Sequence, residues 1–304
     1  MSLTYTYIRY GRCKVKYTNL QKIKQNKNNT HNIINQNNMT LQTITTKQEE
    51  ILTLIYKYKF LNRIQIQSFL KHKDHRRINS WLKDLTEKEY IKRIWSNGYF
   101  ERTRPSIYYL APNSLSFLSK KYFITPRYFP KITAEAEAGA SDNFISDSIL
   151  LADLSLTFLN EDIEGVIRTA VTKTELAEPY SEYSFLADIK IKPSLLLVVS
   201  ASNKSMTKYY FLEIIEQYAS FVLVRNKIKK YFNLYCSNDW EDKMGGKFPA
   251  LHFVCPSLHH LIYAKRYARR IRAEEYEDCK IEFQFSLLEN IKAKGLNGDI
   301  WEKA

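Results

Sequence analysis

Three residues in the second half of the chain have the types and the order of a metal-dependent nuclease site. Glu213 lies in the apolar segment 211–215, Asp188 is the nearest acid before the preceding apolar segment, and Lys227 follows on a predicted helix. In such nucleases, an acid on one strand and Glu-x-Lys on the next hold a divalent ion that activates water. Here Ile215 occupies the Lys position. Only half of the pattern is present, so the three residues are catalytic candidates, and Mg²⁺ is expected only if a nuclease site exists.

A second group of residues has the side chains that contact nucleic acid. The segment that follows Asp74 carries Ile78, Leu82 and Leu85 at helical spacing, with basic and hydrogen-bonding residues between them. Arg and Asn can each make paired hydrogen bonds to a base edge from a helix in the major groove. A solvated helix face is the alternative interpretation. The candidate DNA-binding residues are Arg76, Arg77, Asn79, Ser80 and Lys83, with Arg102 and Arg104 on the following loop.

Other catalytic chemistries lack their residue patterns. The chain has only 8 Gly and no Gly-rich phosphate loop. His259 and His260 are adjacent, so they cannot chelate a metal ion as an i, i+4 pair on a helix does. The 4 Cys residues include no C-x-x-C pair, so neither a zinc ribbon nor a disulfide framework is indicated.

The elements around the predicted DNA-binding segment have the order of a winged helix-turn-helix. Apolar spacing and cap residues predict three helices that begin at Thr46, Asn62 and Asp74. Glu49, three residues after Thr46, completes a capping box. A basic hairpin with an Asn-Gly turn follows. Its strands and a closing helix are predicted at residues 91–95, 106–110 and 113–122.

The remainder of the chain is predicted to be an α/β or α+β domain. Its apolar residues run consecutively, which is typical of a sheet that is covered on both faces. Helices are predicted at residues 142–160, 216–235 and 258–276. Strands are predicted at residues 165–172, 185–192, 191–200, 208–215, 251–255 and 280–285.

Positive charge is concentrated near the N-terminus. Residues 1–45 carry seven Lys or Arg and no acid, residues 46–131 carry eighteen basic and seven acidic residues, and the rest carry 21 and 25. A basic block beside a near-neutral one indicates contact with a polyanion, for which nucleic acid is the first expectation and an anionic membrane the rival. The longest apolar run, 195–199, is far shorter than the roughly 20 residues of a membrane span, so we expect a cytoplasmic protein without a membrane partner.

The composition divides the chain into four segments. Residues 1–45 are rich in Asn, Gln and Lys and are predicted to be a disordered basic arm. Met39 is a second possible start, so residues 1–38 are either this arm or an untranslated extension. The other segments are the winged helix-turn-helix at 46–131, a linker at 132–141 and the α/β domain at 142–304.

Motifs in the second half resemble the replication-relaxation family of plasmid and mobile-element proteins. The motifs that carry the resemblance are Lys192-Pro-Ser-Leu-Leu, Phe211-Leu-Glu, Lys227-Ile-Lys-Lys-Tyr and Gly298-Asp-Ile-Trp. The resemblance extends from about Thr46 to the end of the chain. It implies an α+β fold in which the winged helix precedes a domain similar to PD-(D/E)XK restriction endonucleases. It also implies double-stranded DNA as partner, with other replication or mobilisation proteins.

The chain departs from the family pattern at the metal site. Ser194 stands where the family has Asp, Ile215 where an acid is usual, and Asp147 near a common His. Loss of a metal-binding carboxylate abolishes metal-assisted hydrolysis, so we expect a degenerate site without a cofactor. DNA binding in plasmid replication or mobilisation is thus the first hypothesis. The alternatives are a divalent-metal endonuclease or nickase, and a transcriptional regulator whose second domain dimerises.

Overall fold

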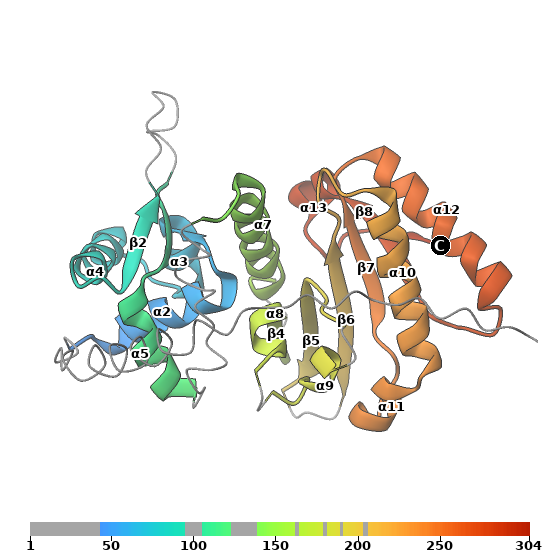
Figure 1. The fold of residues 1–304 in the computed structure, drawn as a ribbon, viewed down its shortest axis with the longest axis horizontal. Coiled ribbons are helices and arrows are strands. Elements are labelled where there is room, and N and C mark those ends of the chain that lie inside the picture. The colour runs from blue at the N-terminus through green and yellow to red at the C-terminus, as the bar shows by residue number, and fades with distance from the viewer. Residues whose placement is uncertain are drawn as a thin grey trace, which may run out of the picture. The chain divides into compact units, whose positions relative to one another are not determined.

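A computed structural model describes residues 43–94, 105–122, 139–161, 164–178, 181–188, 191–202 and 206–304. They form a mixed α/β structure (Figure 1). It contains one sheet of three strands and one of six. The α/β character expected of the chain is thereby confirmed. Residues 1–42 of the predicted arm, the hairpin loop with Arg102 and Arg104, and most of the predicted linker lie outside the described residues.

The N-terminal part combines four helices with the small sheet. Its strands have the order β1-β3-β2 and are antiparallel, with Ile91 opposite Leu110. Ile51, Ile55 and Leu82 are completely or almost completely buried in the core between the helices and the sheet. The elements are α2 (Thr46–Tyr58), β1 (Leu61–Asn62), α3 (Arg63–Phe69), α4 (His75–Glu87), β2 (Ile91–Ile94), β3 (Ile107–Leu110) and α5 (Pro112–Tyr122).

Two of the three predicted helix caps are confirmed. Asn62 caps α3 and Asp74 caps α4, each through a side-chain oxygen that accepts a backbone N–H. The predicted cap of the first helix is wrong by one residue, because Thr45 and Gln48 form the capping box in place of Thr46 and Glu49. Gln48 has both an acceptor and a donor, so it can bond the Thr45 amide and also a neighbouring helix.

The C-terminal part is built around the six-stranded sheet. Its order is β4-β5-β6-β7-β8-β9, in which β6, β7 and β8 are parallel and the other neighbours antiparallel. The elements are α7 (Asp142–Leu159), β4 (Val166–Thr172), α8 (Lys173–Leu176), α9 (Phe185–Asp188), β5 (Leu195–Ala201), β6 (Thr207–Ile214), α10 (Phe221–Cys236), α11 (Asp239–Met244), β7 (Ala250–Cys255), α12 (Leu258–Glu275), β8 (Phe283–Leu287), α13 (Leu288–Lys294) and β9 (Glu302–Lys303).

Helices cover both faces of this sheet. Phe211 and Phe253 belong to the core that includes α10 and α12, whereas their neighbours Leu212 and Val254 belong to the core that includes α7 and α13. Successive strand residues point to opposite faces, so both faces of the central strands are buried. The consecutive apolar residues of the sequence are explained by this arrangement.

The strand predicted at 185–192 is wrong. Residues Phe185–Asp188 form the short helix α9, and Leu186 is completely buried. The Phe185 ring lies 6.0 Å from the Trp240 ring on α11. Packing of these aromatic side chains therefore overrides the extended preference of the segment. The predicted start of α10 at residue 216 is also too early, because Ser220 caps the helix.

Helix α7 contributes to the N-terminal core and to the core on one face of the large sheet. Ala152 packs with the N-terminal helices, whereas Leu154 and Phe158 pack beneath the large sheet. Gln65 on α3 donates its side-chain amide to the Asp153 carboxylate at 2.7 Å. Residues Ile44–Ala304 accordingly form one compact unit.

Candidate functional site

Glu213 is the centre of a buried polar cluster at the end of β6. Its side chain is 4% exposed, and both carboxylate oxygens accept hydrogen bonds. The Tyr231 hydroxyl donates to Oε1 at 2.6 Å. The Lys227 ammonium and the Ser194 hydroxyl donate to Oε2 at 2.9 and 3.1 Å. The carboxylate is therefore fully surrounded by protein donors.

Three neighbouring elements bring these groups together. Glu213 lies on the same face of β6 as Phe211, which faces α10. Lys227 and Tyr231 are four residues apart on α10, so both side chains point from one face of the helix. Ser194 immediately precedes β5, and its hydroxyl accepts from the Ile214 amide at 3.1 Å. The cluster thus links the start of β5 and the end of β6 to α10 through hydrogen bonds and an ion pair.

The cluster keeps Glu213 and Lys227 charged. Burial alone raises the pKa of Glu213, but Lys227, Lys173 and the Tyr231 hydrogen bond outweigh this, so the pKa lies below its ordinary value. Desolvation lowers the pKa of Lys227, but the Glu213 carboxylate outweighs it and the pKa lies above its ordinary value. The pair is therefore an ion pair between a buried carboxylate and a partly exposed ammonium rather than a neutral hydrogen bond.

Other charged groups act on the pair from neighbouring elements. Desolvation by the surrounding protein lowers the pKa of Lys173 at the start of α8, and the field of Glu213 opposes this shift. Burial and the nearby Glu216 raise the pKa of Asp147 on α7. The fields of both Lys173 and Lys227 reach Asp147. Charged side chains from β6, α7, α8, α10 and the β6–α10 loop therefore interact electrostatically at this end of the sheet.

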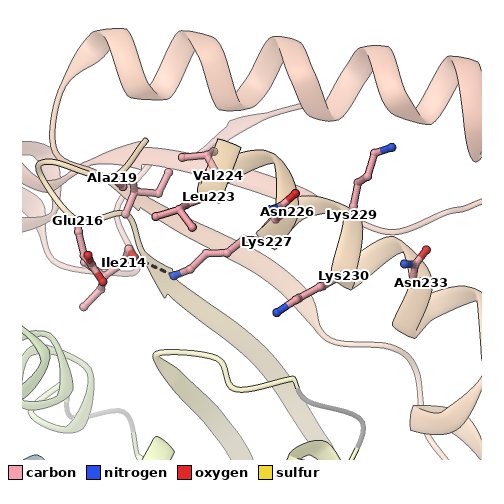
Figure 2. A pocket seen from close by; sticks show the side chains of 11 residues that line it. Ile214, Glu216, Ala219, Leu223, Val224, Asn226, Lys227, Lys229, Lys230 and Asn233 are labelled. Carbon is pink, nitrogen blue, oxygen red and sulfur yellow. Dashed lines mark hydrogen bonds between the residues drawn. The ribbon is translucent and has the colours of Figure 1, made fainter. Parts of the chain in front are cut away.

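A pocket of about 530 Å³ lies beside the cluster along α10. Figure 2 shows Lys227 extending across it to the Ile214 carbonyl, with Glu216 on one side and Lys230 on the other. The Lys227 ammonium donates to that carbonyl at 3.2 Å. The lysine of the ion pair therefore lines the pocket, whereas Glu213 is not one of its lining residues.

The described residues do not fit a divalent metal ion. A hydroxyl stands at Ser194 in place of a carboxylate, and both oxygens of Glu213 are bonded to protein donors. The ammonium groups of Lys173 and Lys227 would repel a cation. No group of three potential metal ligands occurs within the described ranges. The candidate Asp188 ends α9, but its side chain lies outside the described residues.

The predicted DNA-binding face of α4 is solvent-exposed. Ile78, Leu82 and Leu85 are buried on the opposite face of the helix. The Lys83 ammonium lies 3.8 Å from the Glu87 carboxylate. The side chains of Arg76, Arg77, Asn79 and Ser80 have no hydrogen bond or ion pair with a described residue. The exposed candidates are Arg76, Arg77, Asn79, Ser80 and Lys83.

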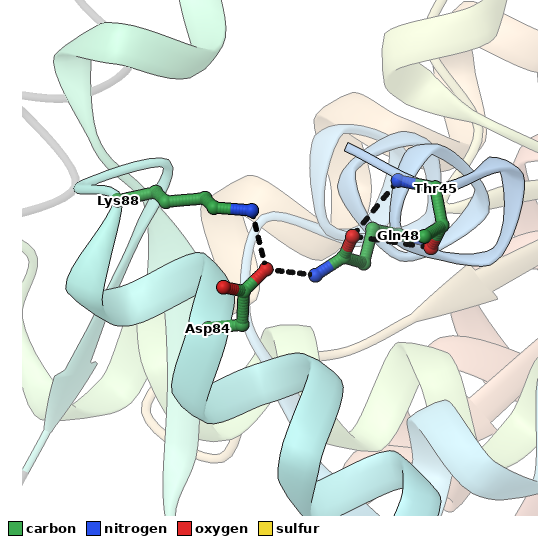
Figure 3. A network of polar contacts seen from close by, with 4 residues as sticks. All are labelled: Thr45, Gln48, Asp84 and Lys88. Carbon is green, nitrogen blue, oxygen red and sulfur yellow. Dashed lines mark hydrogen bonds and ion pairs between the residues drawn. The ribbon is translucent and has the colours of Figure 1, made fainter. Parts of the chain in front are cut away.

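Helix α4 is fixed to α2 by a polar network. Figure 3 shows the Asp84 carboxylate accepting from Gln48 at 2.5 Å and from Lys88 at 2.7 Å. The bond from Lys88 is the main cause that lowers the pKa of Asp84, whereas burial acts in the opposite direction. The network holds the exposed face of α4 in one orientation relative to the N-terminal core.

A groove of about 600 Å³ lies beside the exposed face of α4. Asn79 and Lys83 line one wall, and Arg93 on β2 and Arg63 on α3 also line it. The charges of Arg93 and Arg63 both act on Tyr108, so the two guanidinium groups lie in its vicinity. The groove adds two cations to those expected from the sequence.

Sequence reasoning missed several of these residues. Arg63 and Arg93 are distant in sequence from Asn79, and no spacing indicates that they share a groove. Lys173 had a usable signal, because Thr172 and Glu175 form a capping box that predicts a helix start directly after a strand. Its proximity to Glu213 depends on strand pairing between β4, β5 and β6.

Comparisons with protein families, curated proteins and solved structures gave no match for this chain. None of the helices among the described residues combines the length and apolar character needed to cross a membrane.

Proposed function

We propose that the protein binds double-stranded DNA through α4 and the hairpin formed by β2 and β3, as a winged helix-turn-helix. The observation that carries the proposal is the two-sided character of α4. One face is buried, and the other displays Arg76, Arg77 and Asn79, whose side chains have no partner among the described residues. Such a face suits the hydrogen-bonding edges and phosphates of a major groove.

The element order supports this docking mode. Three helices precede an antiparallel hairpin, and the hairpin lies in one sheet with the short strand β1. Arg63 and Arg93 beside α4 suit contacts to backbone phosphates, which orient a protein on the duplex without reading its sequence. Replication or mobilisation of a plasmid or mobile element is the process that the family resemblance suggests.

In this proposal the six-stranded sheet belongs to a nuclease-like module that has lost hydrolysis. Ser194 and Glu213 lie at the ends of adjacent strands, where the resemblance places a metal site. The ion pair and hydrogen bonds of Glu213 replace metal coordination with protein contacts. A divalent-metal nickase is the second candidate, favoured only by the meeting of Glu213 and Lys227 at 2.9 Å.

A DNA titration of the R76A/R77A variant tests the proposal. Fluorescence anisotropy at one fixed ionic strength should show weaker binding, by roughly 1 to 3 kcal/mol for each Arg that reads a base. K292A/K294A is the matched control, because it removes the same charge from exposed positions on α13. Unchanged affinity of R76A/R77A, or an equal loss in the control, would contradict recognition by α4.

A further inference from the structure

Two cysteines that are far apart in the sequence meet at one end of α10. Cys236 is the last residue of α10, and Cys279 lies in the connection from α12 to β8. Their Sγ atoms are 3.1 Å apart although 43 positions separate them in the chain. Cys236 is exposed, whereas Cys279 is buried. One sulfur of the pair is therefore open to a reagent, and the other lies directly behind it.

Contacts between α10 and the end of α12 hold the two sulfurs in place. The Tyr276 ring stacks on the buried Phe232 with ring centres 4.6 Å apart. Its hydroxyl donates to the Asn233 side chain at 2.7 Å. Lys229, one turn earlier, pairs with Glu275 at 3.1 Å. These contacts flank both cysteines, so their proximity does not depend on one flexible side chain.

We infer that Cys236 and Cys279 form an intramolecular disulfide when the protein meets a low-molecular-weight disulfide as oxidant. A disulfide has an S–S distance of about 2.05 Å, so the sulfurs need to approach by only about 1 Å. The Phe232–Tyr276 stack is compatible with this approach because a change of side-chain torsion at the exposed Cys236 moves its sulfur without moving the helix.

The reaction proceeds by two thiol–disulfide exchanges. The Cys236 thiolate attacks the oxidant, forms a mixed disulfide and releases one small thiolate. The Cys279 thiolate then attacks the Cys236 sulfur, forms the protein disulfide and releases the second. Two protein thiols are oxidised, one small disulfide is reduced to two thiols, and the two protons are transferred to these products.

The environment of Cys279 determines the rate of the second exchange. Burial, and in the reduced pair the hydrogen bond with Cys236, raise the pKa of the Cys279 thiol to about 11. The effect of burial persists when Cys236 has become a mixed disulfide. Only a small fraction is thiolate at neutral pH, so ring closure should accelerate as the pH rises. The disulfide would then link the end of α10 covalently to the segment between α12 and β8.

Oxidation of the full chain carrying C13S tests this inference, because the substitution removes the one thiol outside the described residues. After incubation with oxidised glutathione, peptide mapping should find Cys236 linked to Cys279. The thiol count of the denatured protein should fall from three to one, with Cys255 still reduced. The oxidised protein should also melt several degrees higher, and dithiothreitol should reverse the change.

C236S in the same C13S background is the control. Cys236 is exposed, so this substitution preserves the fold, and both the cross-link and the rise in melting temperature should be absent. A stable glutathione adduct on Cys236 with a free Cys279 would overturn the inference. A disulfide between Cys236 and any other cysteine would overturn it equally.

Discussion

The Tyr231 hydroxyl lies 2.6 Å from the Glu213 carboxylate, and both side chains are almost completely buried. The interaction raises the pKa of Tyr231 further above its ordinary value, beyond the larger effect of burial, because the charged acceptor stabilises the protonated phenol. This bond occupies one carboxylate oxygen that a metal ion would need. Tyr231 therefore stabilises Glu213 as a structural anion.

Removal of this hydroxyl should destabilise the protein without changing its shape. Y231F leaves a buried carboxylate oxygen without a donor, so the free energy of unfolding should fall by about 2 to 3 kcal/mol in urea denaturation. Y235F is the matched control one turn further along α10, because its hydroxyl has no hydrogen bond to a described residue. Equal stability of Y231F and Y235F would show that the bond contributes nothing.

The ion pair between Lys227 and Glu213 should be strongly coupled. K227M leaves a buried carboxylate without its cation and should cost about 3 kcal/mol, the lower end for buried pairs because the Lys227 side chain is 34% exposed. E213Q/K227M should recover much of this loss, since a neutral Gln can still accept from Tyr231 through its carbonyl oxygen and can donate its amide to the Ser194 hydroxyl. A double-mutant cycle measures the coupling, and strictly additive effects would refute it.

Glu178 should make stability decrease as the pH rises. Burial, and next to it the charge of Glu175, raise the pKa of Glu178 from 4.5 to about 7. Its contribution to stability is complete below pH 4.5, where both states are protonated, and is lost as the pH rises through about 7. Solvent screening limits the effect to about 1 to 2 kcal/mol.

Urea denaturation across this pH range, with E178Q as the variant, checks the effect. The stability of wild type relative to E178Q should fall between pH 4.5 and about 7 and then level off. The exposed Glu289 on α13 offers the control E289Q, which should follow wild type. Parallel curves for wild type and E178Q would disprove the assignment.

Supercoiled plasmid with Mg²⁺ or Mn²⁺ should not be nicked by the protein. Glu213 is already neutralised by Lys227 and bonded by Tyr231 and Ser194, so it cannot also bind a cation without breaking these contacts. Gel electrophoresis of the plasmid should show the same low nicking for wild type and E213A. Nicking by wild type that E213A loses would instead establish the endonuclease.

Sequence patterns within a few residues predict helix caps, the buried faces of helices and buried strands. Asp74 followed by Ile78, Leu82 and Leu85 gave both the cap and the buried face of α4, because capping and helical spacing act within a few residues. Consecutive apolar residues in 195–199 predicted a strand covered on both faces. The sequence predicts part of the site, because Glu213 and Lys227 have the residue types of a nuclease site, but it does not predict their contact.

The remaining features depend on distant contacts. The start of helix α11 has no local capping signal, because the backbone of Asn238 is left-handed and its side chain makes no cap hydrogen bond. Two residues, Glu302 and Lys303, form β9 only because they pair with β8. The four scattered cysteines gave no sign that Cys236 and Cys279 meet, because helix packing alone brings their sulfurs together.

The shared position of α7 limits how the chain can be dissected. A fragment that ended at α5 would expose the surface that Ala152 covers and would leave Gln65 without its partner Asp153. A fragment that began after α7 would uncover the sheet face that Leu154 and Phe158 protect. Each half expressed alone therefore requires its own copy of this helix, and unfolding of the intact chain should be cooperative across both sheets.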